Sequence, residues 1–489
     1  MRPHLLPATL LACAVFACLS AWPQYGGLKA IEPASPLIAT GFRLFSQALL
    51  LLPVLFVLLV RAGTRNGYAS LPIHLLLWCI MLCYAHFPTP FFDYVWDVFL
   101  IESIFVYLLS RALLLDTRTA PYSLWPLRLL LFKLMLCMGV VKFLHGMPEW
   151  QNGHALKNFW ANQPMPAFTA WYAAGLPLWV QKTMVAFVFL AEIPGPFLIF
   201  FGRHARLVFF FLNLLLQLGI FASGNYGFFN ILTVVVSFAL LDPVPTPDSP
   251  TTLAKQNNLR ANIGRLVFYS AGVVLAGWLL TSAWYIYRAV APGENYLHET
   301  SWVFLHNREQ ADIPQPMRVL LQTYAVAKVS NPYALFGMIP KYRLEIGLEG
   351  SADAVEWKKY RFRVRPDALD QSPIWYAPHH WRLDHQMYYE SFRIREPHLH
   401  AKYSYFLGVR FMPGLIRELS LANPKVLKLF AENPFPSAPP KVFRFSYRYY
   451  LFTDADEWHR TGNYWKTDSP HAGQFFEKPF TALEAASLP

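Results

Sequence analysis

Long apolar stretches, each followed by a short polar segment, fill residues 1–287. A helix that crosses a membrane needs about 20 mostly apolar residues, so each stretch predicts one spanning helix. The first stretch follows Arg2, and no small-residue cleavage site comes after it, so we interpret it as a retained helix rather than a signal peptide. Counts of seven to nine spans fit the pattern; the nine-span interpretation places them near 5–22, 37–60, 71–88, 93–115, 124–144, 178–201, 205–222, 226–241 and 266–287.

Basic residues gather in every second connection between these stretches, and the intervening connections are nearly neutral. The positive-inside rule makes the basic connections cytoplasmic. Nine spans then put the N-terminus inside, and they put the 145–177 loop and the C-terminal part outside, in a periplasm or a lumen. The basic residues are Arg61, Arg65, Arg111, Arg118, Arg128, Arg203, Arg206, Lys255, Arg260 and Arg265.

The pattern changes after residue 287, where strands and amphipathic helices replace the long apolar runs. Apolar and polar residues alternate over 342–350 and 356–365 around a polar turn, which indicates a hairpin. Further strands are predicted at 324–329 and 442–452, and helices at 405–421 and 424–432. We therefore predict two domains: an α-helical polytopic membrane domain over 1–287, and an extramembrane β-sandwich-like α+β domain over 288–489 with a helical insertion at about 405–432.

The composition agrees with a membrane protein. The 489 residues are 55% hydrophobic and 15% charged, whereas soluble chains carry about a quarter charged residues. This excludes a disordered chain and an ordinary cytosolic enzyme. The net charge of +12 is no argument for nucleic-acid binding, because the excess lies mainly in the loops that topology makes basic.

Several ionisable residues fall inside the predicted spans, where an unpaired charge costs a few kcal/mol. They form either a structural ion-pair network or the lining of a polar cavity. Counting about 1.5 Å per residue from the connection between the fourth and fifth spans puts Glu102 and Lys133 at similar depth and predicts a pair. A second, looser pair between Asp97 and Lys142 is also expected. The predicted buried polar residues are Asp97, Glu102, Lys133, Lys142 and Glu192, with Arg43 and Lys182 at similar depth.

The 145–177 loop on the predicted outer side is rich in Trp, Pro and amide side chains, which suits a rigid lid at the membrane interface. The turn between the seventh and eighth spans, Ser223-Gly224-Asn225-Tyr226, lies on the same side. We expect them to meet above the bundle and form the mouth of a pocket that a client protein contacts. The residues are Trp150, Gln163, Pro164, Met165, Pro166, Asn225 and Tyr226.

The sequence contains no common catalytic motif, such as a nucleophile elbow, a Walker loop or a Rossmann fingerprint. Histidines at 379, 380 and 385 lie close together, but adjacent residues of a strand point to opposite faces and no cysteine is near. We therefore predict no metal site and no cofactor. Arg382 and Asp384 share one face if this segment is a strand, which allows a local ion pair.

Several motifs, in order along residues 90–465, resemble the lipase maturation factor family. The W-D-x-x-x-x-E segment from Trp96 to Glu102, the G-V-V-K segment ending at Lys142, and the S-G-N-Y turn that contains Asn225 are typical of it. In the C-terminal part, Trp381-Arg382-Leu383-Asp384 and Asn433-Pro434-Phe435-Pro436 match the family pattern. Arg382, Asp384, Asn433 and Pro434 are therefore candidate site residues of the C-terminal domain.

The resemblance implies a polytopic membrane protein that assists the folding and assembly of secreted lipases. In animals the membrane is that of the endoplasmic reticulum, with the C-terminal domain in the lumen. A compact chain without cysteines in this domain also fits a bacterial inner membrane and a periplasmic domain. The implied partners are the lipid bilayer and a secreted client protein, possibly a lipase, and the implied role is chaperone-like and needs no catalytic residue.

A second, shorter resemblance favours an alternative. Gly139 to Gly153, with Lys142 and Trp150, is similar to the membrane domain of vitamin K-dependent carboxylases. In that family a lysine at this motif acts as a base on a reduced quinone. The alternative is therefore a membrane enzyme for a lipid or quinone-linked substrate, with Lys142 as base and Glu102, Asp97 or Glu192 setting its charge.

Overall fold

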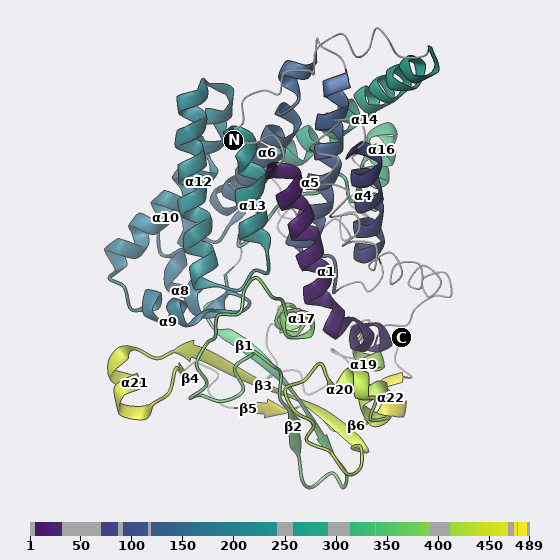
Figure 1. Cartoon of the computed structure of the whole chain (residues 1–489). Coiled ribbons are helices and arrows are strands. Elements are labelled where there is room, and N and C mark those ends of the chain that lie inside the picture. The colour runs from purple at the N-terminus through teal and green to yellow at the C-terminus, as the bar shows by residue number, and fades with distance from the viewer. Residues whose placement is uncertain are drawn as a thin grey trace.

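A bundle of apolar helices stands above a small antiparallel sheet (Figure 1). The structure, a computed structural model, describes residues 5–31, 70–86, 91–115, 119–241, 258–291, 313–337, 339–391, 411–467, 474–476 and 478–486. We call the described helices up to residue 291 the bundle, and the described residues from 329 on the sheet domain. The end of the bundle that faces the sheet domain is its sheet end.

Eight of the nine predicted spans coincide with helices, and the span at 37–60 lies outside the described residues. Four helical stretches in the described part of the chain are long and apolar enough to cross a membrane: Leu6–Ile31, Leu178–Phe200, Arg203–Ser223 and Gly264–Val290. The nine-span count therefore remains a prediction. The bundle helices are α1 (Leu5–Ile31), α4 (Ser70–His86), α5 (Val95–Ala112), α6 (Trp125–Val140) with a π-helical end (Val141–His145), α10 (Leu178–Glu192), α11 (Pro194–Phe197), α12 (Arg203–Ser223), α13 (Phe229–Ser237) and α14 (Asn258–Val290).

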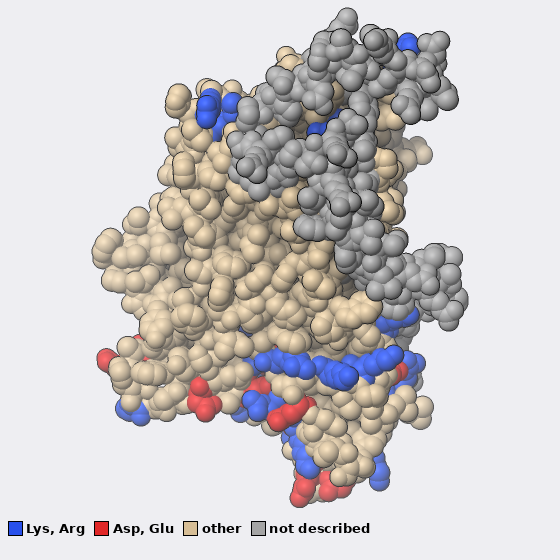
Figure 2. All heavy atoms as spheres, viewed as in Figure 1, with Lys and Arg blue, Asp and Glu red and all other residues tan. Residues whose placement is uncertain are grey.

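The bundle buries its polar side chains within a mostly apolar interior and exposes apolar side chains on its outside, as expected in a membrane. On α12, Asn213 and Gln217 are buried, while the opposite face exposes an apolar stripe at helical spacing. Figure 2 shows a face without charged side chains over α10 and α12, between basic side chains at one end and the charged sheet domain at the other. This distribution matches a lipid-facing surface. The stripe consists of Val208, Phe211, Leu215 and Leu218.

Three short helices close the sheet end of the bundle: α7 (Pro148–Gln151), α8 (Ala155–Asn162) and α9 (Phe168–Ala174). They belong to the segment 145–177, whose richness in Pro and Trp predicts a rigid lid. A helix α16 (Gln315–Val326) packs beside α14. The prediction of a strand at 324–329 is wrong, because Pro316 lies in the first turn of this helix and favours its start.

The sheet domain contains one antiparallel sheet in the order β2-β1-β3-β4, with β5 and β6 also pairing with β3. The predicted hairpin and the strand at 442–452 are confirmed. The predicted sandwich is wrong for the described residues, because these strands form a single sheet whose apolar face packs on helices instead. The strands are β1 (Arg343–Ser351), β2 (Lys358–Tyr360), β3 (Val442–Phe452), β4 (Trp465–Lys466), β5 (Gln474–Phe476) and β6 (Phe480–Thr481).

The register of β1 and β3 separates an apolar from a charged face. Ile346 lies opposite Tyr447 on the apolar face, whereas Glu345 lies opposite Arg448 on the charged one. The described part of the predicted helical insertion forms α19 (Met412–Ser420) and α20 (Pro424–Leu427), and Asn423 caps α20 as the Asn-Pro signal predicts. Two further helices are α17 (Arg382–Ser391) and α21 (Ala455–Thr461), and a short α22 (Ala482–Ala486) follows the sheet.

Bundle and sheet domain share one hydrophobic core rather than touching at a narrow neck. The end of α1 packs against α19 and α20, and Gly27 permits their close approach. A Cβ on Gly27 would lie 2.5 Å from the backbone oxygen of Lys425. The first predicted span therefore also anchors the sheet domain.

Candidate functional site

A buried carboxylate on α5, Glu102, accepts hydrogen bonds from three other segments of the chain. Its Oε1 accepts from Lys133 Nζ on α6 and from Trp278 Nε1 on α14, the latter at 2.9 Å. Its Oε2 accepts from the backbone and side chain of Asn331, at 3.1 and 3.0 Å, and from Tyr333 OH at 2.7 Å. The predicted pair of Glu102 and Lys133 is present, and a loop that follows α16 joins it.

Lys133 lies inside an aromatic cage. Its Nζ is 5.5 Å from the ring centre of Trp278, 6.0 Å from that of Tyr285 and 5.1 Å from that of Tyr333. A cation over aromatic faces is stabilised where water is absent, and Lys133 is only 1% exposed. The cage and the carboxylate together hold an ammonium group inside an apolar bundle.

A second buried pair joins α6 to α10. Lys142, in the π-helical end of α6, donates to both oxygens of Glu192 at 2.8 and 2.7 Å. The helices approach closely at Gly139, where a Cβ would lie 2.7 Å from the Cβ of Glu192. The ring centre of Trp150 is 5.8 Å from Lys142 Nζ. The predicted pair of Lys142 with Asp97 is therefore wrong.

Asp97 pairs across the junction with the sheet domain. The guanidinium of Arg382 donates to both carboxylate oxygens of Asp97, at 2.8 and 2.9 Å, and to the backbone oxygen of Phe91 at 2.5 Å. Its Cζ lies 4.1 Å from the ring centre of Phe92. Because Asp97 also lies in the first turn of α5, the helix dipole favours its negative charge. The backbone N–H of Arg382 donates to Gln24 Oε1 of α1 at 2.8 Å.

The two segments predicted to form a pocket mouth do meet. Gln163 Nε2 donates to the backbone oxygen of Ser223 at 2.9 Å, and Tyr226 OH donates to Gln163 Oε1 at 2.6 Å. Asn225 donates from backbone and side chain to the oxygen of Met165, at 3.0 and 3.1 Å. These side chains are at most 4% exposed, so they form a packed contact rather than an accessible rim.

The sheet domain forms hydrogen bonds with both segments of this contact. Arg343 of β1 donates to the backbone oxygens of Gln163, at 2.5 Å, and Pro164, at 2.8 Å. Pro166 forms an isolated bridge with Gly224. Asn225 Oδ1 accepts from the backbone N–H groups of residues 376 and 377, at 2.8 and 2.9 Å. The loop residues thus join the bundle to the sheet domain.

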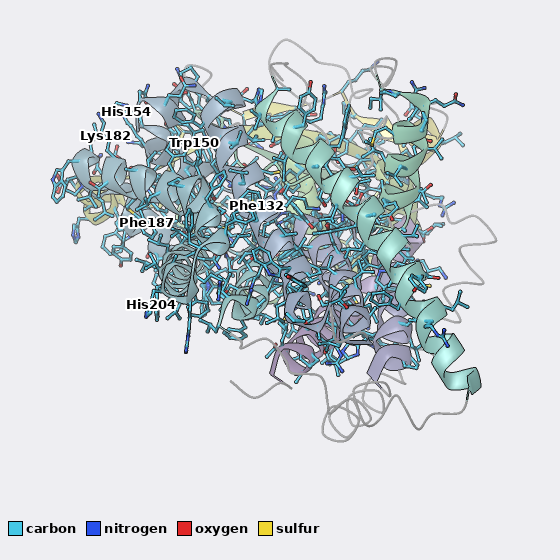
Figure 3. All side chains as sticks on the ribbon, turned by 90° about the horizontal axis from the view of Figure 1, so that it is seen from above. Phe132, Trp150, His154, Lys182, Phe187 and His204 are labelled. Atoms are coloured by element: carbon cyan, nitrogen blue, oxygen red, sulfur yellow. The ribbon has the colours of Figure 1, made fainter. Side chains whose placement is uncertain are left out.

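Trp150 makes a further link to the sheet domain, because its Nε1 donates to the backbone oxygen of Phe336 at 2.8 Å. The view from above in Figure 3 shows Trp150, His154 and Lys182 in one region of the bundle. A Cβ on Gly153, whose φ is +78°, would lie 3.2 Å from Lys182 Cγ. Lys182 itself is exposed, as expected of a lysine that extends toward the membrane surface.

The predicted cluster of the C-terminal domain does not form one site. Arg382 turns to Asp97, whereas Asp384 accepts from the backbone N–H of Val364 at 2.8 Å. Asn433 accepts from the backbone N–H of Phe435 at 2.9 Å and is exposed, as an Asn-Pro turn before Pro434 allows. The local pair of Arg382 and Asp384 is wrong because the segment is the helix α17, not a strand, so the two side chains point to different neighbours.

Two buried histidines occupy the centre of the junction. The rings of His380 and His385 are 4.5 Å apart, and both contact the rings of Tyr94 and Trp96 at 4.4 to 5.2 Å. None of their ring nitrogens has a hydrogen-bond partner in the described structure. No group of three or more His, Cys, Asp or Glu suited to a metal ion is found in the described part of the chain.

Because these histidines are buried, the stability of the folded protein depends on pH. Burial first, and then the neighbouring charges of Arg382 and Arg343, lower the pKa of His385 from 6.5 to about 3. Burial, His385 and Arg382 lower the pKa of His380 well below its usual value. Above pH 6.5 the rings are neutral in both folded and unfolded chains. Below that pH only the unfolded chain takes up the protons, so stability falls as the pH falls.

We expect the replacement His385→Phe, which keeps a ring in the cluster, to weaken this dependence. Between pH 6.5 and about 4 the free energy of unfolding of the native chain should fall by about 1.4 kcal/mol per pH unit more than that of the variant. Burial raises the pKa of Asp384 to about 7 and acts in the opposite sense, but it cancels in the comparison. Melting curves in detergent at several pH values measure the difference; parallel curves for the two proteins would contradict the assignment.

A cavity of about 220 Å³ opens on the charged face of the sheet. Gly347 and Ser446, opposite each other on β1 and β3, form its floor, and the pair of Lys359 and Asp367 forms one wall. It is smaller than most small-molecule sites, which measure about 300–1,000 Å³. Glu345 at its edge is held by Arg343 and Arg365, and despite burial these two cations lower its pKa.

Sequence reasoning missed most partners of the buried charges. Asn331 lies 229 residues from Glu102, and Arg382 lies 285 residues from Asp97. The signal is indirect: each buried charge requires a partner, and that partner can lie outside the spans. The missed residues are Trp278, Asn331, Tyr333, Arg343 and His385 with its neighbours Tyr94 and Trp96.

A helical bundle with apolar outer faces and paired charges inside, tied to an extramembrane sheet domain, defines an integral membrane protein. Comparison with protein families gives two matches: the lipase maturation factor transmembrane domain over residues 33–245, and the lipase maturation factor C-terminal domain over residues 329–473. Together they cover more than half of the chain. The chain belongs to the lipase maturation factor family.

Individual relatives agree with the family matches. The chain is 27% identical to lipase maturation factor 2 of Rattus norvegicus, over 83% of this chain and 70% of the relative. It is 27% identical to lipase maturation factor 2 of Homo sapiens, over 81% and 67%, and 26% identical to lipase maturation factor 1 of Homo sapiens, over 77% and 65%. No solved structure matches the chain.

Proposed function

We propose that the protein is a membrane-anchored maturation factor that assists the folding and assembly of secreted proteins, with lipases as the client class. The observation that carries the proposal is the pair of family matches, in order, over both the bundle and the sheet domain. Relatives that carry the name lipase maturation factor align with most of the chain. The client class comes from those names.

The proposed role is chaperone-like, and the geometry is compatible with it. Some of the polar candidate residues pair within one part of the protein, and others, such as Asp97, Glu102 and Asn225, hold the bundle and the sheet domain together. The sheet domain therefore has a fixed position on the bundle, and its β1–β2 hairpin turn points away from the bundle (Figure 1). A partly folded client that exposes apolar surface would meet a rigid platform beside the membrane.

The proposal includes a topology of nine spans, with the division between domains near residue 288. The sheet domain lies on the extracytoplasmic side, either the lumen of the endoplasmic reticulum or a bacterial periplasm. Two features support this arrangement. Arg203 and Arg206 begin α12 at the end far from the sheet domain, as the positive-inside rule expects of a cytoplasmic loop. Ser223, at the other end of α12, contacts the loop at 163–167.

The alternative, a membrane enzyme with Lys142 as base, receives little support from the geometry. Both oxygens of Glu192 accept hydrogen bonds from Lys142, so its Nζ is already engaged within the bundle. A base must reach its substrate, and Lys142 is 3% exposed. The pair fits a structural connection between α6 and α10 better.

Photo-crosslinking of the intact protein in membranes tests the proposed function. A photoreactive amino acid at Val355, in the exposed hairpin turn, should capture a newly made secreted lipase and lose it once the lipase has folded. The same group at Leu215, on the lipid-facing stripe of α12, is the matched control and should capture no lipase. Equal capture at both positions, or no lipase at any exposed position of the sheet domain, would contradict the proposal.

A further inference from the structure

An exposed aromatic loop of the sheet domain lies beside the lipid-facing surface of the bundle. Ile374 and Trp375 are 45% and 46% exposed, although both residues are apolar. Trp375 Nε1 donates to the backbone oxygen of Phe221 at 3.0 Å, and the two rings meet edge to face at 5.2 Å. The loop is thus fixed against the last turn of α12.

The depth of this loop follows from α12. The helix has 21 residues, which at about 1.5 Å each equals roughly the thickness of the hydrocarbon core. Its exposed apolar stripe ends at Leu218, one turn before Ser223. Because Trp375 contacts Phe221, its ring lies at the level where the hydrocarbon core gives way to the headgroups.

Helix α9 has the same character on the neighbouring surface. One face carries Trp171, which donates to Thr453 Oγ1 at 3.3 Å and contacts the ring of Trp458 in the sheet domain. The opposite face exposes Phe168 and Tyr172, by 48% and 65%. Two side chains four residues apart share a helix face, so α9 separates a packed side from an exposed apolar side.

The beginning of α10 extends this surface. Trp179, in the first turn, is 71% exposed, and Leu176 and Leu178 beside it are 38% and 42% exposed. Tryptophan and tyrosine are enriched at the two membrane–water interfaces. Their rings are favourable at the edge of the acyl chains, and their polar atoms remain near water. The exposed aromatic residues of three segments therefore lie where such a belt is expected.

We propose that the loop at 374–375, together with α9, inserts into the bilayer leaflet on the side of the sheet domain. The occupant of this apolar surface is the acyl-chain and glycerol region of phospholipids. The surface is continuous with the lipid-facing stripe of α12, which argues for lipid rather than for a protein partner. The sheet domain is then held at one edge by lipid as well as by the Arg382–Asp97 pair.

The proposed insertion does not depend on the proposed function, but it would affect how a client reaches the sheet domain. A sheet domain whose edge enters the leaflet holds its charged face at a fixed height above the lipid surface. Apolar segments of a client that partition to the membrane surface would then reach the same level.

Spin labelling in phospholipid nanodiscs tests the insertion. The five native cysteines are replaced, and a nitroxide is attached at Ile374, whose backbone contact to Asn225 survives a side-chain change. Label positions at Leu215 on α12 and at Val355 in the hairpin turn serve as lipid and water references. Accessibility to oxygen, which concentrates in lipid, is compared with accessibility to a water-soluble nickel complex.

The label at Ile374 should behave like the label at Leu215, with oxygen collisions exceeding nickel collisions by several-fold. Nickel accessibility at Ile374 equal to that at Val355 would overturn the proposal, and low accessibility to both reagents would also overturn it by indicating a protein partner. A lipid-like result at Leu215 confirms in each case that the bundle is inserted. If the Ile374 variant melts below the native chain, a label at Tyr172 replaces it with the same expectations.

Discussion

Replacing Glu102 with Gln should destabilise the protein by about 3–5 kcal/mol, because it leaves the Lys133 ammonium buried without a carboxylate. The amide also exchanges an acceptor oxygen for an NH₂ donor. In one orientation of the amide that NH₂ faces the donors of Lys133 and Trp278, and in the other it faces those of Asn331 and Tyr333. Two donors that face each other in an apolar interior are costly, since neither finds an acceptor.

The replacement Lys133→Met should cost less, because the carboxylate keeps its other donors on Trp278, Asn331 and Tyr333. The double variant should melt above Glu102→Gln alone, since the uncompensated cation is gone. Lys182→Met on the exposed part of α10 is the matched control and should melt like the native chain. Thermal melting in detergent compares the four variants with the native chain; a double variant whose loss equals the sum of the single losses would show that the two residues do not interact.

Replacing Arg382 with Met should destabilise the junction between the sheet domain and the bundle. The substitution removes two hydrogen bonds to Asp97 and one to Phe91, and it leaves a buried carboxylate at the start of α5. A loss of about 3–5 kcal/mol is expected. Arg382→Lys should recover only part of it, because an ammonium cannot make the bidentate contact of a guanidinium.

An exposed pair of the same domain provides the control. Arg361 and Glu432 lie 3.4 Å apart with side chains more than half exposed, so Arg361→Met should cost no more than about 1 kcal/mol. Hydrogen exchange of α17 and of the segment before it measures the effect at the junction. Exchange there should rise strongly in Arg382→Met and remain unchanged in Arg361→Met. Unchanged exchange in Arg382→Met would show that the junction does not depend on this pair.

Secondary structure is predicted best where the residue pattern repeats with the same period as burial in the fold. The strand Val442–Phe452 alternates aromatic and polar residues, one face is buried, and its observed bounds equal the predicted ones. The spans are found for a similar reason, since lipid requires apolar side chains over the full length of a helix. Depth along two neighbouring helices was sufficient to pair Glu102 with Lys133, because a short connection fixes their relative height.

The prediction failed where tertiary contacts outweigh local pattern. The helix Arg382–Ser391 is polar in composition, yet nearly every one of its side chains is buried, and Arg382 and Asp384 meet partners from distant segments. No local period reveals such a helix, and the expected local pair of Arg382 and Asp384 would require a strand. The predicted partner of Asp97 was wrong for the same reason, because its actual partner, Arg382, lies outside the predicted spans.

The candidate site was predicted in part. The residues Gln163, Asn225 and Tyr226 meet as their Trp-Pro-amide surroundings suggest, but the sequence does not reveal that the sheet domain covers them. Composition identifies residues that lie at an interface between water and lipid. It does not indicate whether a second domain occupies that interface, because amide side chains satisfy water and backbone groups equally well.

We propose that this chain matures secreted lipases, and the activity of a secreted lipase provides the test. The chain is produced in cells that make a secreted lipase but lack their own lipase maturation factor, and lipase activity in the medium is measured against lipase protein. The account predicts that the native chain raises the activity per lipase molecule and that Arg382→Met raises it far less at equal membrane abundance. An inserted, folded native chain that leaves the activity per lipase molecule at the level of cells without it would contradict the account.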